Sequence, residues 1–260
     1  MLRKMILITL ITVFVIILIG SYTRFFPGEA EGHQKELTVA AASDLYFAFQ
    51  ELGGLFEEQT GVTVTFLFGS SGNLSQQIMH GAPIDLFFSA NRQWVEQLEQ
   101  SGHLIEKSQK LYARGRIVLA VNKKSGLKIT SLEDLLFSDI ERMAIANPNH
   151  APYGQAAKEA LESAEVWQVL EEKMVYGENV SQTLKFIQSG NAPVGIIALS
   201  LVDVLDIDYY IIDESLHKPL EQMMAVVAGS PNQEEALKFI QFMESDTGRT
   251  IMKSYCFFLP

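Results

Sequence analysis

The stretch from Leu37 to Leu45, which reads LTVAAASDL, constrains the fold more than any other part of the sequence. Its first five residues are apolar except for Thr38 and predict a short strand buried inside a covered parallel sheet. Polarity changes at Ser43 and Asp44, and helical spacing of apolar residues follows as far as Phe56. The first N–H groups of a helix have no hydrogen-bond partner within the helix. Ser43 or Asp44 can satisfy them as an N-cap, which is a purely structural role. Alternatively, these N–H groups, the helix dipole and the serine hydroxyl together favour the binding of an anion.

The same strand, turn and helix pattern occurs four times in the chain. The four turns are Ser43-Asp44, Gly69-Ser70-Ser71-Gly72, Ala151-Pro152-Tyr153-Gly154 and Asn179-Val180-Ser181. Consecutive strand–helix units indicate a parallel sheet with right-handed crossovers, and a second set of units begins with the strand at Arg116. Within these units we expect helices from Leu74 to His80 and from Gln155 to Val169. We therefore expect an α/β protein with two lobes, each a mostly parallel sheet flanked by helices, and a ligand cleft where the strand ends meet.

The donors in these turns predict how an anion would be held. Hydroxyl groups would come from Ser43 and Ser71, and backbone amides from around Tyr153 and Val180. None of the four turns contains Lys or Arg. A dianion would therefore be bound by dipoles and hydrogen bonds, whose strength depends on burial and preorganised geometry.

The N-terminal segment has the pattern of a secretory signal. Arg3 and Lys4 precede an uncharged apolar run, Met5–Gly20, and small residues at Gly28 and Ala30 predict cleavage after Ala30, so that residues 1–30 form the signal peptide. The alternative is an uncleaved membrane anchor, for which sixteen apolar residues are marginal. No cysteine stands directly after the apolar run, so lipid attachment at that point is excluded. We expect an exported, periplasmic protein.

Charge and cysteine content limit the partners. Without residues 1–30 the net charge is 17 − 30 = −13, which argues against nucleic acid and anionic lipid as partners. The chain has a single cysteine, Cys256, so it has no internal disulfide.

Several motifs, taken together and in order, carry a resemblance to a known family. They are Ala40-Ala-Ala-Ser43, Phe68-Gly-Ser-Ser-Gly-Asn73, Gly81-Ala-Pro-x-Asp85-Leu-Phe-x-Ser89-Ala90, Pro152-x-Gly154 with Ala157-Lys-Glu-Ala160, and Asn191-Ala-Pro-x-Gly195. From Leu37 to the C-terminus the chain resembles the periplasmic molybdate-binding proteins of ABC transporters.

The resemblance implies a type II periplasmic-binding fold that closes on molybdate or tungstate. It implies a monomeric binding protein that delivers its ligand to a membrane permease, with no enzymatic activity and no cofactor. We expect residues 36–115 and 225–260 to form the first lobe and residues 116–224 the second.

The resemblance also assigns roles to individual positions. Ser43 and Ser71 match hydroxyl donors of the family, while Tyr153 and Val180 match positions that use backbone N–H groups. Some members add a tyrosine hydroxyl where this chain has Ala198, so that donor is missing or replaced. Ala198 and Ser70 are kept as further candidate positions.

Other polar residues receive structural interpretations. Asp85 is expected to fix backbone N–H groups near the cleft, and Asp44 to be a helix cap pointing away from it, because a carboxylate beside a dianion is repulsive. His150, next to the Tyr153 turn, is a candidate for a supporting role. The other histidines (His33, His80, His103 and His217) lack metal-ligand spacing and are expected at the surface.

The aromatic residues Trp94 and Trp167 are expected to pack in the core. Tyr46 and Phe47 fit a position in the wall of the cleft as well as one in the core.

The alternatives are of other classes or bind other ligands. A hydrolase is disfavoured because Asn73 stands where a Gly-x-Ser-x-Gly elbow needs its last glycine. A periplasmic dehydratase on the same fold would need an acid or base in the cleft. Within the binding class, sulfate or phosphate is the rival ligand.

Overall fold

A computed structural model describes residues 35–137 and 139–260, so the predicted signal peptide lies outside the described residues. The described strands form two five-stranded sheets. In spatial order, the first sheet contains β2 (Thr63–Gly69), β1 (Glu36–Ala42), β3 (Leu86–Ser89), β10 (Leu220–Val226) and β4 (Lys110–Gly115). The second contains β7 (Met174–Gly177), β6 (Met143–Ala146), β8 (Val194–Ala198), β5 (Ile117–Asn122) and β9 (Ile207–Ile211).

Each sheet is parallel in one part and antiparallel in the other. In the first sheet β1 pairs in parallel with β2 and β3, while β10 runs antiparallel to β3 and β4. In the second, β6 pairs in parallel with β7 and β8, while β5 runs antiparallel to β8 and β9. Of the described strands, only β10 in the first sheet and β5 in the second run against the other four strands of their sheets, so the predicted α/β fold of two mostly parallel sheets is confirmed.

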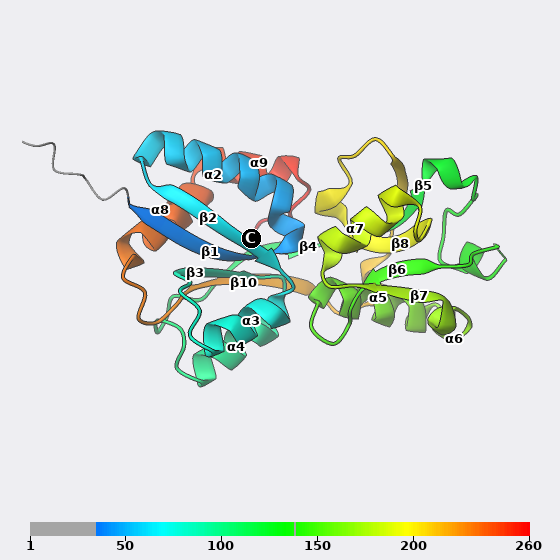
Figure 1. The fold of residues 1–260 in the computed structure, drawn as a ribbon, viewed down its shortest axis with the longest axis horizontal. Coiled ribbons are helices and arrows are strands. Elements are labelled where there is room, and N and C mark those ends of the chain that lie inside the picture. Colours follow the sequence, from blue (N-terminus) through cyan, green and yellow to red (C-terminus); the bar gives the residue numbers. More distant parts are fainter. Residues whose placement is uncertain (1–34, 138) are drawn as a thin grey trace, which may run out of the picture. The chain divides into compact units, whose positions relative to one another are not determined.

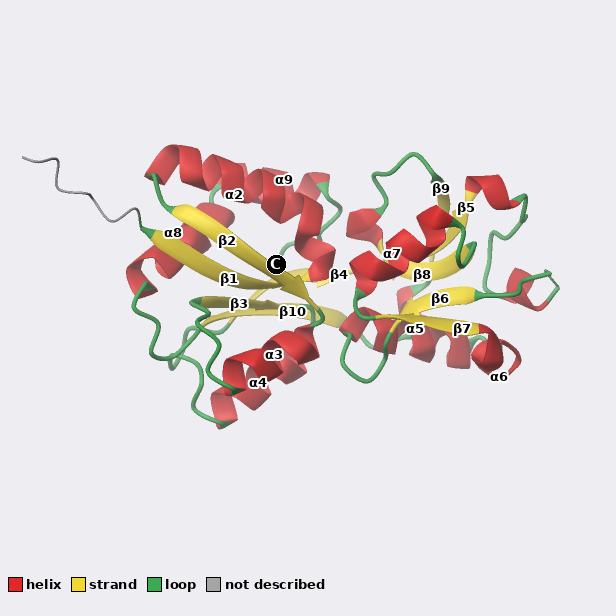
Figure 2. Ribbon diagram, in the orientation of Figure 1, coloured by secondary structure: helices red, strands yellow, loops and turns green. Residues whose placement is uncertain are grey.

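The helices cover both faces of the sheets (Figures 1 and 2). They are α2 (Tyr46–Thr60), α3 (Ser71–Met79), α4 (Arg92–Gln100), α5 (Pro152–Ser163), α6 (Trp167–Leu170), α7 (Val180–Ser189), α8 (Gln233–Glu244) and α9 (Asp246–Ser254). On one face of the first sheet, α2, α8 and α9 bury a phenylalanine-rich core, and α3 and α4 bury a smaller one on the other face. We call this sheet with its five helices the first lobe, and the second sheet with α5, α6 and α7 the second lobe.

The start of the first lobe follows directly from the sequence pattern. Leu45, Phe49, Leu52 and Phe56 are fully buried, as their helical spacing predicts. The helix ends at Gly61, whose φ of 70° is the left-handed C-cap conformation that favours glycine. A short 3₁₀ turn, η1 (Ser43–Leu45), joins β1 to α2.

Several predicted boundaries are wrong. The long helix expected from Gln155 to Val169 is two helices, α5 and α6, separated where Glu165 adopts a φ of 57°. The helix after the second turn begins at Ser71 rather than Leu74, and β4 was not predicted. The chain enters the second sheet between β4 and β5, and β10 belongs wholly to the first sheet, so the return crossing precedes Leu220 instead of lying at residues 224–225.

The structure also shows where the aromatic residues singled out in the sequence lie. Trp167 is buried and Trp94 is partly buried against the α3–α4 core. Phe47 packs against the core of the second lobe, whereas Tyr46 is exposed. Among the described residues, no helix is both long and apolar enough to cross a bilayer.

Asp85 fixes backbone and side-chain donors, but at the opposite end of β1 from the turn at Ser43. Its Oδ2 atom accepts a hydrogen bond from the Thr38 N–H at 2.8 Å, and its Oδ1 atom accepts one from the Ser230 hydroxyl at 2.6 Å. Asn232 donates to both oxygens. The predicted structural role is confirmed, while the expected place near the cleft is wrong.

We predict that Asp85→Ala lowers the free energy of unfolding by about 2–3 kcal/mol, because buried donors lose their acceptor. Chemical denaturation measures this loss. Ligand affinity of the folded variant should stay at the wild-type value, and a large loss of affinity would place Asp85 in the cleft after all.

Candidate oxyanion-binding site

The four predicted turns meet at one cavity. The cavity is small and open to solvent on one side. From the first lobe it is lined by Ala42, Ser43, Asp44, Gly69, Ser70, Ser71 and Ala90, and from the second by Ala151, Pro152, Tyr153, Asn179 and Val180. Five of the six candidate positions are therefore in its wall, and only Ala198 is not.

The two serine hydroxyls are oriented by backbone amides. Ser71 Oγ accepts a hydrogen bond from the Ala90 N–H at 2.9 Å, and Ser43 Oγ accepts one from the Ser181 N–H at 3.4 Å. A hydroxyl that accepts from an amide still has its own proton to donate. Both side chains can therefore donate to an anion in the cavity.

Helix starts supply further donors. α3 begins at Ser71, α5 at Pro152 and α7 at Val180, so the N–H groups of Ser71, Tyr153 and Val180 lie in first turns and have no intrahelical acceptor. Proline at the first position of α5 has no N–H and a preset φ, which makes Tyr153 the first donor of that helix. These amides add partial positive charge from three helix dipoles to the cavity.

Close approach of the α5 start to the second sheet requires Gly154. A Cβ atom at this position would lie 2.1 Å from the carbonyl oxygen of Ala146, at the end of β6. Only glycine lets the turn carrying the Tyr153 amide settle against this strand.

His150 supports the cavity from the second lobe. Its Nδ1 atom lies 2.8 Å from Ser70 Oγ, and its carbonyl oxygen accepts from the Gly72 N–H at 2.9 Å. A side chain at Gly72 would collide with that carbonyl at 2.7 Å. His150 is thus joined to Ser70 and Gly72 across the two lobes, and its supporting role at the site stays a prediction.

Two more contacts join the lobes around the cavity. The Ser181 hydroxyl donates to the Ser43 carbonyl at 2.7 Å, and the Asn73 amide donates to the Glu178 carboxylate. The structure is therefore a closed arrangement, with the two lobes bonded directly to one another at the site.

The position of Asp44 differs most from the sequence prediction, which made it a helix cap pointing away from the cleft. Its side chain caps no helix and is buried, where Oδ2 accepts from the Tyr153 hydroxyl at 3.0 Å and from Gln222 Nε2 at 2.6 Å. Oδ1 is buried with no partner among the described residues. Desolvation by burial raises the pKa of Asp44 from 3.8 to about 7, against the opposing effect of hydrogen bonds from Gln222 and Tyr153.

The tyrosines around Asp44 are also perturbed. Burial, reinforced by the charge of Asp44, raises the pKa values of Tyr112 and Tyr153 well above 10.0. Both hydroxyls are therefore neutral at physiological pH. The sequence alone did not reveal this cluster, because Asp44 and Gln222 are 178 residues apart.

The remaining polar residues do not form a metal site. Within residues 35–137 and 139–260 no group of three or more His, Cys, Asp or Glu side chains could hold a metal ion. His80 is exposed and His103 is partly exposed, but the surface position expected for His217 is wrong, since it is buried and bonds to the Lys218 carbonyl. His33 lies outside the described residues.

Two α/β lobes enclosing a shared cavity lined by helix starts define a periplasmic binding protein. A family profile described as "Bacterial extracellular solute-binding protein" matches residues 37–258, and the chain belongs to this family.

Individual relatives agree with this assignment. The molybdate-binding protein ModA of Rhodobacter capsulatus is 32% identical over 221 residues, covering 85% of this chain and 87% of the relative. That of Escherichia coli K12 is 29% identical over 238 residues, covering 88% and 91%. The structure of the Azotobacter vinelandii periplasmic molybdate-binding protein superposes with a TM-score of 0.81 at 29% identity, covering 86% and 99%. Their names describe binding proteins rather than enzymes.

The pKa of Asp44 leads to a prediction about stability. In the unfolded chain the carboxyl ionises near pH 3.8, but in the folded protein only near pH 7. Between these values the unfolded state binds fewer protons, so stability is full below pH 3.8 and falls until about pH 7, by a total on the order of 4 kcal/mol. Denaturation curves of wild type and Asp44→Asn across this range should converge at low pH and diverge as pH rises, with wild type the less stable. Parallel curves would contradict the prediction.

Proposed function

We propose that this chain captures molybdate, and tungstate as well, outside the cytoplasm and delivers it to the permease of an ABC transporter. The observation that carries the proposal is the convergence of hydroxyl and backbone donors from both lobes on one cavity with neither Lys nor Arg in its wall. The relatives named as molybdate-binding proteins support the choice of ligand.

The arrangement suits a tetrahedral dianion. Ser43 and Ser71 would donate hydroxyl protons, and Tyr153 and Val180 would donate backbone N–H groups. Donors on opposite walls surround the anion only when the lobes meet, so ligand binding favours closure. A permease would then recognise the closed arrangement, and the protein itself would act as a monomer without cofactor or enzymatic activity.

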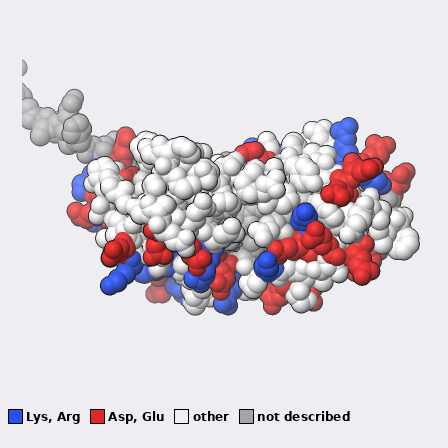
Figure 3. Space-filling view, turned by 90° about the horizontal axis from the view of Figure 1, so that it is seen from below, with Lys and Arg blue, Asp and Glu red and all other residues white. Residues whose placement is uncertain are grey.

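The proposal extends to the export route. The charge and hydropathy of residues 1–30 support a cleaved signal peptide that sends the mature protein to the periplasm. Where charged side chains gather on the face shown in Figure 3, along its lower part and right side, acidic and basic groups alternate and no large basic patch is visible. This agrees with a protein that recognises its anion inside a cavity rather than on a basic surface.

Calorimetry of the mature protein tests the ligand. We expect 1:1 binding of molybdate and tungstate, with weak or absent binding of sulfate and phosphate, because fixed donors on a closed cavity select anion size. Equal affinity for sulfate and molybdate would defeat the selectivity, and no heat with any tetrahedral oxyanion would defeat the proposed function.

Serine variants test the site. Ser43→Ala and Ser71→Ala each remove one donor to a charged acceptor, worth roughly 1.5–3 kcal/mol, so molybdate affinity should fall about tenfold to a hundredfold. Ser75→Ala is the matched control, since its hydroxyl is buried on the same helix as Ser71 and has no partner among the described residues. Wild-type affinity in both cavity variants would show that the two serines have only a structural role.

A further inference from the structure

The side chain of Tyr153 reaches from the second lobe into the first. Its hydroxyl donates to Asp44 Oδ2 at 3.0 Å and accepts from Gln222 Nε2 at 2.9 Å. Gln222 also donates to the same Asp44 oxygen at 2.6 Å. These three buried side chains, which we call the interlobe anchor, form a closed triangle of hydrogen bonds below the cavity.

The anchor lies against the strand that leaves the first lobe. Gly115 ends β4, two residues before β5 begins in the second sheet. A Cβ atom at Gly115 would lie 2.2 Å from the Tyr153 hydroxyl and 2.9 Å from Gln222 Nε2. The absence of a side chain at this point of the crossing is therefore what lets the Tyr153 hydroxyl enter.

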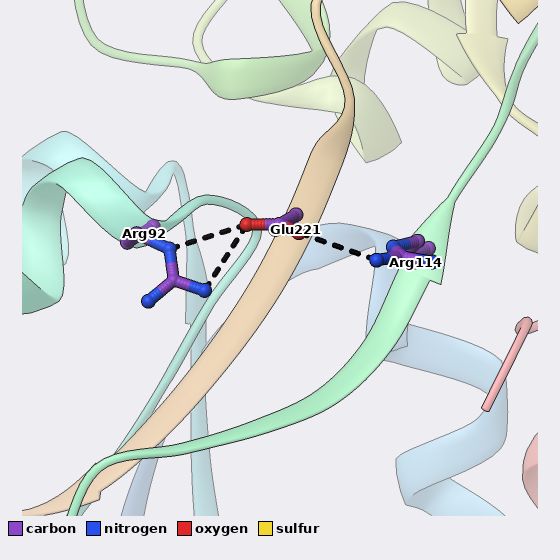
Figure 4. A network of polar contacts seen from close by, with 3 residues as sticks. All are labelled: Arg92, Arg114 and Glu221. Atoms are coloured by element: carbon purple, nitrogen blue, oxygen red, sulfur yellow. Dashed lines mark hydrogen bonds and ion pairs between the residues drawn. The ribbon is translucent and has the colours of Figure 1, made fainter. Parts of the chain in front are cut away.

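The strand that carries Gln222 is fixed from its other face. Successive residues of a strand point to opposite faces, so Glu221 faces away from the anchor. Glu221 binds Arg92 at 3.1 Å and Arg114 at 3.4 Å, which ties β10 to the start of α4 and to β4 (Figure 4). The strand that carries Gln222, the donor to the Tyr153 hydroxyl, is thus tied to its neighbours in the first lobe.

Tyr153 has two separate functions in this geometry. Its backbone N–H is the first donor of α5 at the cavity, and its side chain bonds to the opposite lobe. We infer that the Tyr153 side chain is a positioning residue for oxyanion binding, which anchors the start of α5 to Asp44 and Gln222 and so fixes its own amide against the ligand. The inference rests on the proposed function, because it concerns the same cavity.

Tyr112 provides a natural comparison. It is buried in the first lobe, the charge of Asp44 acts on it, and its hydroxyl has no partner among the described residues. Removal of this hydroxyl changes the surroundings of Asp44 without breaking a bond between the lobes. Tyr112→Phe is thus a matched control for Tyr153→Phe.

The test uses the mature full-length protein and molybdate. Tyr153→Phe keeps the backbone amide and the ring but loses both anchor hydrogen bonds, so affinity should fall about tenfold, equivalent to ~1.4 kcal/mol. Small-angle scattering should show compaction at a correspondingly higher molybdate concentration. Tyr112→Phe should match wild type in both measurements.

Further variants separate positioning from general damage to the fold. Gly115→Ala leaves Tyr153 intact but blocks its hydroxyl, and should weaken binding as Tyr153→Phe does. Asp44→Asn keeps an acceptor oxygen and should retain most of the affinity, whereas Asp44→Leu should not. Equal affinity of Tyr153→Phe and wild type overturns the inference while the proposed function stands.

A ligand-independent measurement completes the test. In a double-mutant cycle, Tyr153→Phe and Asp44→Leu should be strongly non-additive in unfolding experiments without ligand, because each removes the same hydrogen bond. Additive effects would overturn the anchor itself. Absence of molybdate binding by wild type, with non-additivity intact, would instead defeat the proposed function and with it the positioning role.

Discussion

The structure depends on backbone N–H groups that their own helices cannot satisfy. Three helices begin at the carboxyl ends of parallel strands, and Ser71, Tyr153 and Val180, which lie in the first turns of these helices, line the same cavity. In an enclosed site such dipoles interact strongly because little water screens them. Neutral donors can therefore do what a cluster of lysines would do elsewhere, and in the proposed function their fixed directions would discriminate by anion size.

The same arrangement links recognition to closure. Each lobe supplies only part of the donor set, and direct hydrogen bonds such as Ser181 to Ser43 appear where the lobes meet. A ligand stabilises this arrangement only through contacts that an open form lacks. In the proposed closure, the lobe-to-lobe bonds around the cavity would add to the free energy that the ligand contacts supply.

Local features of the fold could be predicted from the sequence, and features that depend on distant residues could not. The run from Leu37 to Ser43 shows its strand and turn by polarity alone, and Gly61 shows the end of the next helix. Parallel strands end at the same edge of a sheet, which brings together the two turns of each lobe. Ligand clefts lie at such edges, so the meeting of the four turns in one cavity wall was predictable. The break at Glu165 was missed because helical spacing continues through it, and the burial of His217 depends on packing that no local pattern records.

Asp44 shows why the polar chemistry of the site needed the structure. A serine–aspartate pair before a helix favours a cap, and nothing nearby in sequence indicates that the carboxyl instead meets Tyr153 and Gln222. Its partners are neutral, and its burial favours the uncharged form. A dianion in the adjacent cavity would shift Asp44 further toward that form, since a carboxylate beside it is repulsive. The acidic residue is therefore compatible with an anion site because its burial favours the uncharged form, and it serves as an acceptor for the Tyr153 hydroxyl of the second lobe.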